Sequence, residues 1–197
     1  MKVVLQAAAV MAVSVTAALA AGDVLDGKSA KKMLFSHKGS EFVIQSQDFM
    51  TDADQTTLNA MAGMKEFKSV FYYGAIAAAP KHGLAHKATV ATSNHHSIEA
   101  AEQAALAECN GLRGGGAKCL VVAQILPKKF SLQSFHLSAS ATAAFKKTYL
   151  RGKGPKALAI SPRQGSFAVS KGDTAATTAL EACAADGAKD CQIVIQD

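Results

Sequence analysis

Hydrophobic and polar positions predict a complete α+β unit in the middle of the chain. Residues 73–79 and 84–91 have the pattern of two strands, and the Pro-Lys-His-Gly sequence between them is typical of a turn. The alanine-rich stretch 97–108 predicts an amphipathic helix. The unbroken apolar run 120–126 predicts a central strand. The predicted order of elements is therefore ββαβ.

The same pattern returns in shorter form near the C-terminus. A Pro-Arg-Gln-Gly turn, an alanine-rich helix and two cysteines stand at matching places. The predicted elements are strands at 157–161, 167–170 and 192–195 and a helix at 174–185. A hairpin, a helix and a third strand can together bury one face of a small sheet. The sequence therefore predicts an α+β fold, a two-layer sandwich built from two tandem ββαβ units.

The segments outside these units also carry element signals. Thr51 is followed by acidic residues, and this combination favours the first turn of a helix, whose dipole is positive there. The buried stripe of that helix would consist of Leu58, Met61 and Met64. Asn94 and Ser97 are alternative caps for the helix of the first unit. Other predicted elements are a short basic helix at 30–35, strands at 41–45 and 130–137, and a helix at 138–149.

The first twenty residues predict an export signal. Lys2 precedes an almost wholly apolar run at 3–19, and Ala18-Leu19-Ala20 has the small-x-small pattern of a cleavage site. The run is too short and too rich in alanine for a good membrane span. We therefore expect cleavage near Ala20 and a periplasmic or secreted chain that does not span the membrane. The expected organisation is a signal peptide at 1–20, an N-terminal α/β extension at 21–69, units at 70–127 and 156–197, and a connecting segment with a basic linker at 128–155.

The four cysteines lie in the two units, one local pair in each. In an oxidising compartment an even number at matched places is typical of a disulfide framework. Three pairings are possible, and the repeated pattern favours Cys109 with Cys119 and Cys183 with Cys191. Each bond would stabilise the fold by about 2–3 kcal/mol in the chain-entropy description. A four-cysteine zinc site is the alternative, although neither pair has the Cys-x-x-Cys spacing of a zinc knuckle.

These positions resemble a family of secreted bacterial proteins, the domain of unknown function 4189. The resemblance rests on Ala-Ile-Ala, Pro-x-x-Gly, an alanine-rich helix ending in cysteine, and a cysteine that opens a Val-Val strand. In the first unit the matching residues are Ala75, Ile76, Ala77, Pro80, Gly83, Ala100, Ala101, Ala104, Ala105, Cys109, Cys119, Val121 and Val122. Weaker echoes are Ala157, Ala159, Pro162, Gly165, Ala179, Cys183, Cys191 and Val194. The resemblance implies an exported, disulfide-bonded domain, and it implies no activity and no catalytic residues.

Histidines provide the strongest signal for an enzyme. Four of them fall within fifteen positions around the predicted turn and helix start: His82, His86, His95 and His96. Such a group could converge on zinc or copper. The second unit has Gln164 and Ala168 where the first has His82 and His86, so the fold itself does not require these two histidines. The alternative is that they are ordinary surface histidines near a turn.

Charge suggests a partner surface. The chain has a net charge of +6, or +5 without Lys2, and its basic linker contains Arg151, Lys153 and Lys156. These side chains could attract an acidic protein or an anionic envelope component. The alternative is a solvated face that keeps an alanine-rich protein soluble. Nucleic acid is not an expected partner outside the cytoplasm, and the sequence leaves the oligomeric state open.

The sequence therefore predicts an exported, disulfide-stabilised, non-catalytic binding module for an unidentified protein or envelope component, with no cofactor. The alternative is a small periplasmic metal-dependent enzyme or hydrolase that uses the four histidines. Exported proteins similar to this one sometimes carry the label 5-aminolevulinate synthase. That enzyme needs a large pyridoxal-phosphate fold with a Schiff-base lysine, and a signal-bearing chain of this length cannot hold it. We expect no such activity.

Overall fold

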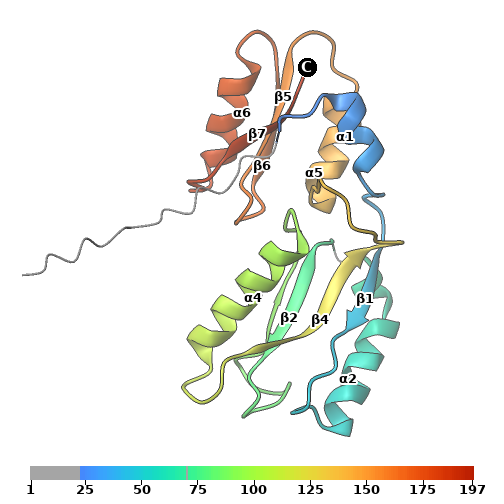
Figure 1. The fold of residues 1–197 in the computed structure, drawn as a ribbon, viewed down its shortest axis with the longest axis vertical. Coiled ribbons are helices and arrows are strands. Elements are labelled where there is room, and N and C mark those ends of the chain that lie inside the picture. The colour runs from blue at the N-terminus through green and yellow to red at the C-terminus, as the bar shows by residue number, and fades with distance from the viewer. Residues whose placement is uncertain (1–22, 70) are drawn as a thin grey trace, which may run out of the picture.

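Two units lie end to end along the long axis of the molecule (Figure 1). The computed structural model describes residues 23–69 and 71–197, so the predicted signal peptide lies outside the described residues. Each unit is built on its own antiparallel sheet, with strand order β1-β4-β2-β3 in the first and β6-β5-β7 in the second. In the described part of the chain, no strand pairing joins the two sheets.

From its N-terminal side, the described chain first contributes α1 to the second unit. It then forms the first unit and returns to complete the second. The first unit contains β1 (Ser40–Ile44), α2 (Asp52–Gly63), α3 (Lys65–Ser69), β2 (Gly74–Ala78), β3 (Val90–Thr92), α4 (Ile98–Leu112) and β4 (Leu120–Pro127). The second contains α1 (Gly27–Met33), α5 (Ala139–Ala144), the π-helical turn η1 (Phe145–Tyr149), β5 (Lys156–Ile160), β6 (Phe167–Lys171), α6 (Ala175–Ala184) and β7 (Gln192–Gln196). The start of α1 is held there because Leu25 pairs with Ile195 and the Gly27 N–H donates to the Asp197 carboxylate at 2.8 Å. The extension predicted at 21–69 is thus divided between the units.

Both units have the same core topology. The hairpin β2–β3, α4 and β4 in the first unit correspond to the hairpin β5–β6, α6 and β7 in the second. The central strand of each sheet also shifts register at the matching place, between Ile76 and Ala77 in β2 and between Leu158 and Ala159 in β5. The predicted α+β class is confirmed, since each unit packs one sheet against the helix of its ββαβ motif.

Each unit carries one disulfide at the same structural position. Cys109 near the end of α4 bonds to Cys119, which directly precedes β4, and Cys183 near the end of α6 bonds to Cys191, which directly precedes β7. The predicted pairing is confirmed. All four sulfurs are used, so the alternative of a four-cysteine zinc site is wrong.

Alternate residues of the central strands pack in two different cores, as the two-residue period of a strand requires. Ala75 and Ala77 of β2 pack in the core that contains α4, and their small side chains let that helix lie close to the sheet. Ile76 and Ala78 pack in a second core with Leu58 of α2. In the same way, β5 faces α6 on one side and α1, α5 and η1 on the other. Helices from outside the ββαβ motifs therefore cover the second face of each sheet.

The strand predicted at 84–91 is only partly formed, and regular pairing begins at Val90 in β3. Side chains accept the backbone N–H groups before it: the Asp54 carboxylate accepts from Leu84 at 3.1 Å, and His86 Nδ1 accepts from Ala88 at 3.2 Å. These hydrogen bonds take the place of the backbone hydrogen bonds that a longer strand would form with β2.

The strand predicted at 130–137 does not form. Its aromatic side chains pack together instead, since the rings of Phe130 and His136 both lie edge-on to Tyr73, with centroids 6.0 and 5.5 Å away. The Tyr73 hydroxyl bonds to His136 Nδ1 at 2.9 Å. The alternation in the sequence therefore reflects a small aromatic cluster rather than a sheet.

The observed helix starts agree more closely with the sequence predictions than the strands do. Thr51 and Asp54 form a reciprocal capping box at the start of α2. Ser97, rather than Asn94, caps α4 by accepting the Ala100 N–H at 3.1 Å. Of the stripe predicted on α2, Leu58 is fully buried, Met61 is half-buried and Met64 is exposed.

Candidate functional site

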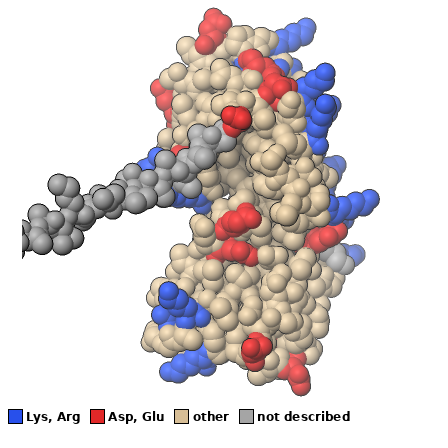
Figure 2. Space-filling view, viewed as in Figure 1, with Lys and Arg blue, Asp and Glu red and all other residues tan. Residues whose placement is uncertain are grey.

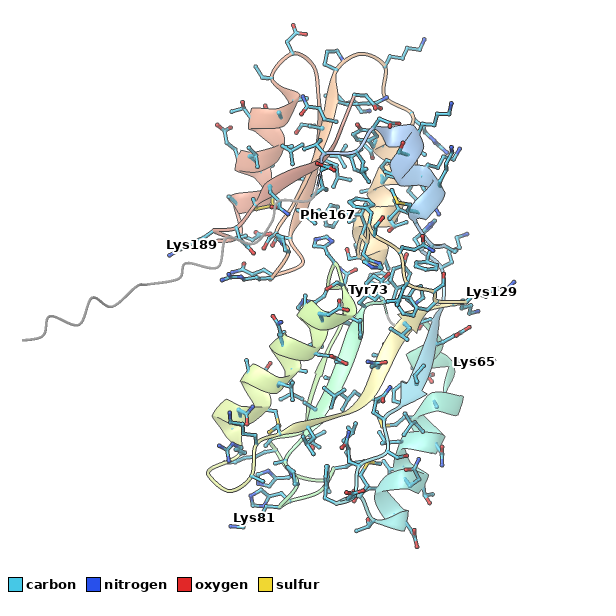
Figure 3. All side chains as sticks on the ribbon, in the orientation of Figure 1. Lys65, Tyr73, Lys81, Lys129, Phe167 and Lys189 are labelled. Atoms are coloured by element: carbon cyan, nitrogen blue, oxygen red, sulfur yellow. A yellow bond between two sulfur atoms is a disulfide. The ribbon has the colours of Figure 1, made fainter. Side chains whose placement is uncertain are left out.

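His96 connects the two units through both nitrogens of its ring. The Ser138 backbone N–H donates to Nδ1 at 3.1 Å, and Nε2 donates to the Ser166 carbonyl at 3.1 Å. An N–H can only donate and a carbonyl can only accept, so these partners fix a neutral imidazole with its proton on Nε2. The side chain is 3 % exposed, and this burial lowers the pKa of His96 to about 4. The ring also packs edge-on against Phe167 of the second unit, which Figure 3 labels at the junction.

The neighbours of His96 complete a clasp, which we define as segment 94–96 of the first unit held against turn 161–166 of the second. The Asn94 side chain accepts the Ser140 N–H at 3.0 Å, and the backbone carbonyl of Asn94 lies directly against Gly165. His95 is half-buried beside the backbone of Arg163, and burial lowers its pKa. His95 and His96, both predicted as metal ligands, therefore hold the units together.

His82 and His86 lie at the opposite end of the first unit, beside Lys81, which Figure 3 labels there. Their rings are stacked, with centroids 4.0 Å apart and planes 15° from parallel. A metal ion binds in the plane of an imidazole ring, so two parallel rings cannot both direct a nitrogen at one ion. Within the described residues, no three His, Cys, Asp or Glu side chains could hold a metal ion together. The four histidines form two separate pairs rather than one site.

The basic linker is also divided. Lys156 points inward: its ammonium lies 3.3 Å from the Asp197 carboxylate, donates to the Gly152 carbonyl and lies 5.2 Å from the centre of the Tyr149 ring. Lys156 therefore stabilises the second unit and is not part of an open partner surface. Arg151 and Lys153 remain exposed.

A cavity of about 540 Å³ lies where the two units meet on the side of α5, and we call it the α5 cavity. Three segments that are distant in sequence line it: 37–40 before and at the start of β1, residues 69, 71 and 72 before β2, and one face of α5 and η1. Phe71 is 52 % exposed beside it, whereas Tyr72 is buried in its wall. Lys38 and Lys147 line it with their exposed side chains.

Positive charge around the α5 cavity is not balanced. No Asp or Glu is among the described residues that line it, and neither Lys38 nor Lys147 forms an ion pair within the described part of the chain. Lys128 adds a third cation, because a Cβ atom placed on the cavity residue Gly39 would lie 3.0 Å from the Lys128 ammonium nitrogen. Figure 2 shows Lys and Arg gathered along this edge of the second unit, where α1 and α5 lie.

The same positive charges also affect the pKa of His37. Burial is the first cause that lowers the pKa of His37, and the ammonium groups of Lys146, Lys38 and Lys147 lower it further. Basic pairs are visible in the sequence at 146–147 and near residue 38, but nothing in the spacing indicates that they converge. Only the packing of α5 against the first unit brings them together.

A second hollow, of about 630 Å³, lies on the other side of the clasp. It is lined by Glu99 and Gln103 of α4 and by Pro162 and Arg163 of the clasp turn. Its acidic and basic side chains balance, so it favours no particular class of ligand.

Comparisons of this chain with protein-family models, with curated proteins and with solved structures find no match. None of the helices described in the structure is long and apolar enough to cross a bilayer. A functional hypothesis therefore depends on the geometry of the sites described above.

Proposed function

We propose that this protein is an exported, disulfide-stabilised, non-catalytic binding module whose ligand or partner occupies the α5 cavity. Export is supported by the two disulfides, which form and persist in oxidising compartments. The predicted signal peptide and the resemblance to a secreted family agree with it. The common topology of the two units supports their origin as copies of one ancestral unit.

The observation that carries the proposal is the unbalanced charge of the α5 cavity. Lys38 and Lys147 line a cavity that contains no carboxylate among its described residues, with Lys128 close by. A charged group without a partner attracts an ion of opposite sign. An acidic group of a ligand or partner would supply the missing charge.

The histidine arrangement gives no comparable support to a metal-dependent enzyme. Both nitrogens of His96 are used by backbone groups, and the stacked rings of His82 and His86 would have to turn before they could share an ion. The pair of the buried Tyr73 and the half-buried His136 is also structural in character, because burial raises the pKa of Tyr73 and keeps its hydroxyl protonated.

A crosslinking pull-down of the full chain from its own cell envelope, combined with native mass spectrometry, tests the proposal. The cavity variant is Lys38→Ala with Lys147→Ala. The control is Lys87→Ala with Lys118→Ala, which removes the same charge from exposed positions outside the cavity. We expect the natural protein and the control to retain one stoichiometric ligand or partner and the cavity variant to lose it. Equal capture by all three proteins, or capture by none, would overturn the proposal.

A further inference from the structure

The α5 cavity has two chemically different parts. Exposed ammonium groups of Lys38 and Lys147 provide a cationic part, and His37 lies beside them. The apolar part consists of the half-exposed ring of Phe71 and the methyl groups of Ala139 and Ala143 on α5. This pairing matches a ligand with one charged end and one apolar end.

The size of the cavity favours a small molecule over a folded partner. Its volume of about 540 Å³ lies within the range of about 300–1,000 Å³ that is typical of small-molecule sites. Such sites combine apolar walls with a few polar groups that orient the ligand, and the Ser140 hydroxyl lies in the lining for that role, whereas the Ser69 hydroxyl already donates to the Glu66 carbonyl at 2.8 Å.

The cations in this site favour a carboxylate over a phosphate group. Phosphate sites usually combine Arg forks with several backbone N–H groups at a helix start or a glycine-rich loop. The described residues that line this cavity include no Arg, and its ammonium groups act as point charges beside apolar walls. A ligand with one negative charge and an apolar body does not need the larger set of hydrogen-bond donors that a phosphate group needs.

We infer that the α5 cavity binds a small amphiphilic carboxylate, with its carboxylate between Lys38 and Lys147 and its apolar body against Phe71 and α5. This inference rests on the proposed function and names its ligand class. The binding is reversible and involves no covalent step.

Isothermal titration of the full-length protein with n-alkyl carboxylates of four, six and eight carbons, and with the alcohols of equal length, tests the inference. Each additional buried CH₂ should increase the affinity about fourfold. The carboxylate should bind at least about tenfold more tightly than the alcohol at low salt, and this ratio should fall at high salt because the charges are screened.

Two variants separate the contributions of charge and shape. Lys38→Ala with Lys147→Ala should abolish the preference for carboxylates and keep the dependence on chain length. Ala143→Leu should weaken both series, because its larger side chain fills the apolar part. The control pair Lys87→Ala and Lys118→Ala should bind like the natural protein, and equal thermal midpoints check that each variant is folded.

The possible results distinguish this inference from the proposed function. Equal affinity for carboxylates and alcohols, or no effect of Ala143→Leu, would overturn the assigned ligand class. A partner that depends on the cavity in the pull-down, together with no carboxylate binding, would overturn the inference and leave the proposed function standing. Failure of both experiments would overturn both.

Discussion

Acidification should weaken the fold through His96, because its buried ring is held neutral by the Ser138 N–H and the Ser166 carbonyl. The pKa of His96 is about 4 in the folded protein, against 6.5 for an ordinary histidine. The unfolded chain therefore binds more protons between these values. The stabilisation is fully present above pH 6.5 and is lost as the pH falls through about 4.

The size of the effect follows from the two pKa values. Proton linkage gives a loss of about 2 kcal/mol at pH 5 and about 3 kcal/mol at pH 4 relative to the neutral form. The nearby charge of Asp190 opposes this loss and a charged His95 increases it, and the pKa of His96 already includes both influences. A loss of this size is a large fraction of the stability of a typical domain, about 5–15 kcal/mol.

Urea denaturation at pH 7 and pH 5 measures the effect. The informative variant is His96→Gln, whose side chain keeps a donor and an acceptor but does not titrate. The natural protein should lose about 2 kcal/mol more than this variant between the two pH values. Subtracting the loss of stability of the variant from that of the natural protein removes the contribution of carboxylates and of the other histidines.

His82→Gln is the matched control, because it removes an exposed histidine at the far end of the first unit. It should keep the pH dependence of the natural protein. If His96→Gln loses as much stability between pH 7 and pH 5 as the natural protein does, the assigned role of His96 is wrong.

Four further predictions test local features of the fold by urea denaturation. Reduction of both disulfides should cost about 5 kcal/mol in total, and an unchanged midpoint in reductant would contradict this. Gly165→Ala should cost about 2 kcal/mol, because the residue has φ +78° and its Cβ would lie 2.9 Å from the Asn94 carbonyl oxygen. Gly111→Ala is the opposite case: the position lies in α4 with open space around it, so it should stabilise by about 0.5 kcal/mol. Thr51→Ala should cost about 1 kcal/mol by removing the α2 capping box, and an effect near zero would show that the box contributes nothing.

Local patterns in the sequence predicted much of the architecture because the physics behind them is local. Strand and helix periods, turn residues and caps depend on neighbours a few positions away, and so does the pairing of Cys109 with Cys119. The pattern failed at 84–91 and 130–137, where side-chain capping and aromatic packing replaced strand pairing. The same limit explains Lys156, whose partner Asp197 is distant in sequence.

The candidate site was decided by tertiary structure. The sequence by itself determined the order of the elements, the disulfide framework and the basic character of the chain. It could not determine that His96 would be buried between Ser138 and Ser166, because those partners lie 42 and 70 residues away. Nor could it bring Lys38 and Lys147 to one cavity, since their meeting depends on how α5 packs against the first unit. Burial and electrostatic potential depend on position in space, and these two properties turn ordinary histidines and lysines into a clasp and a binding site.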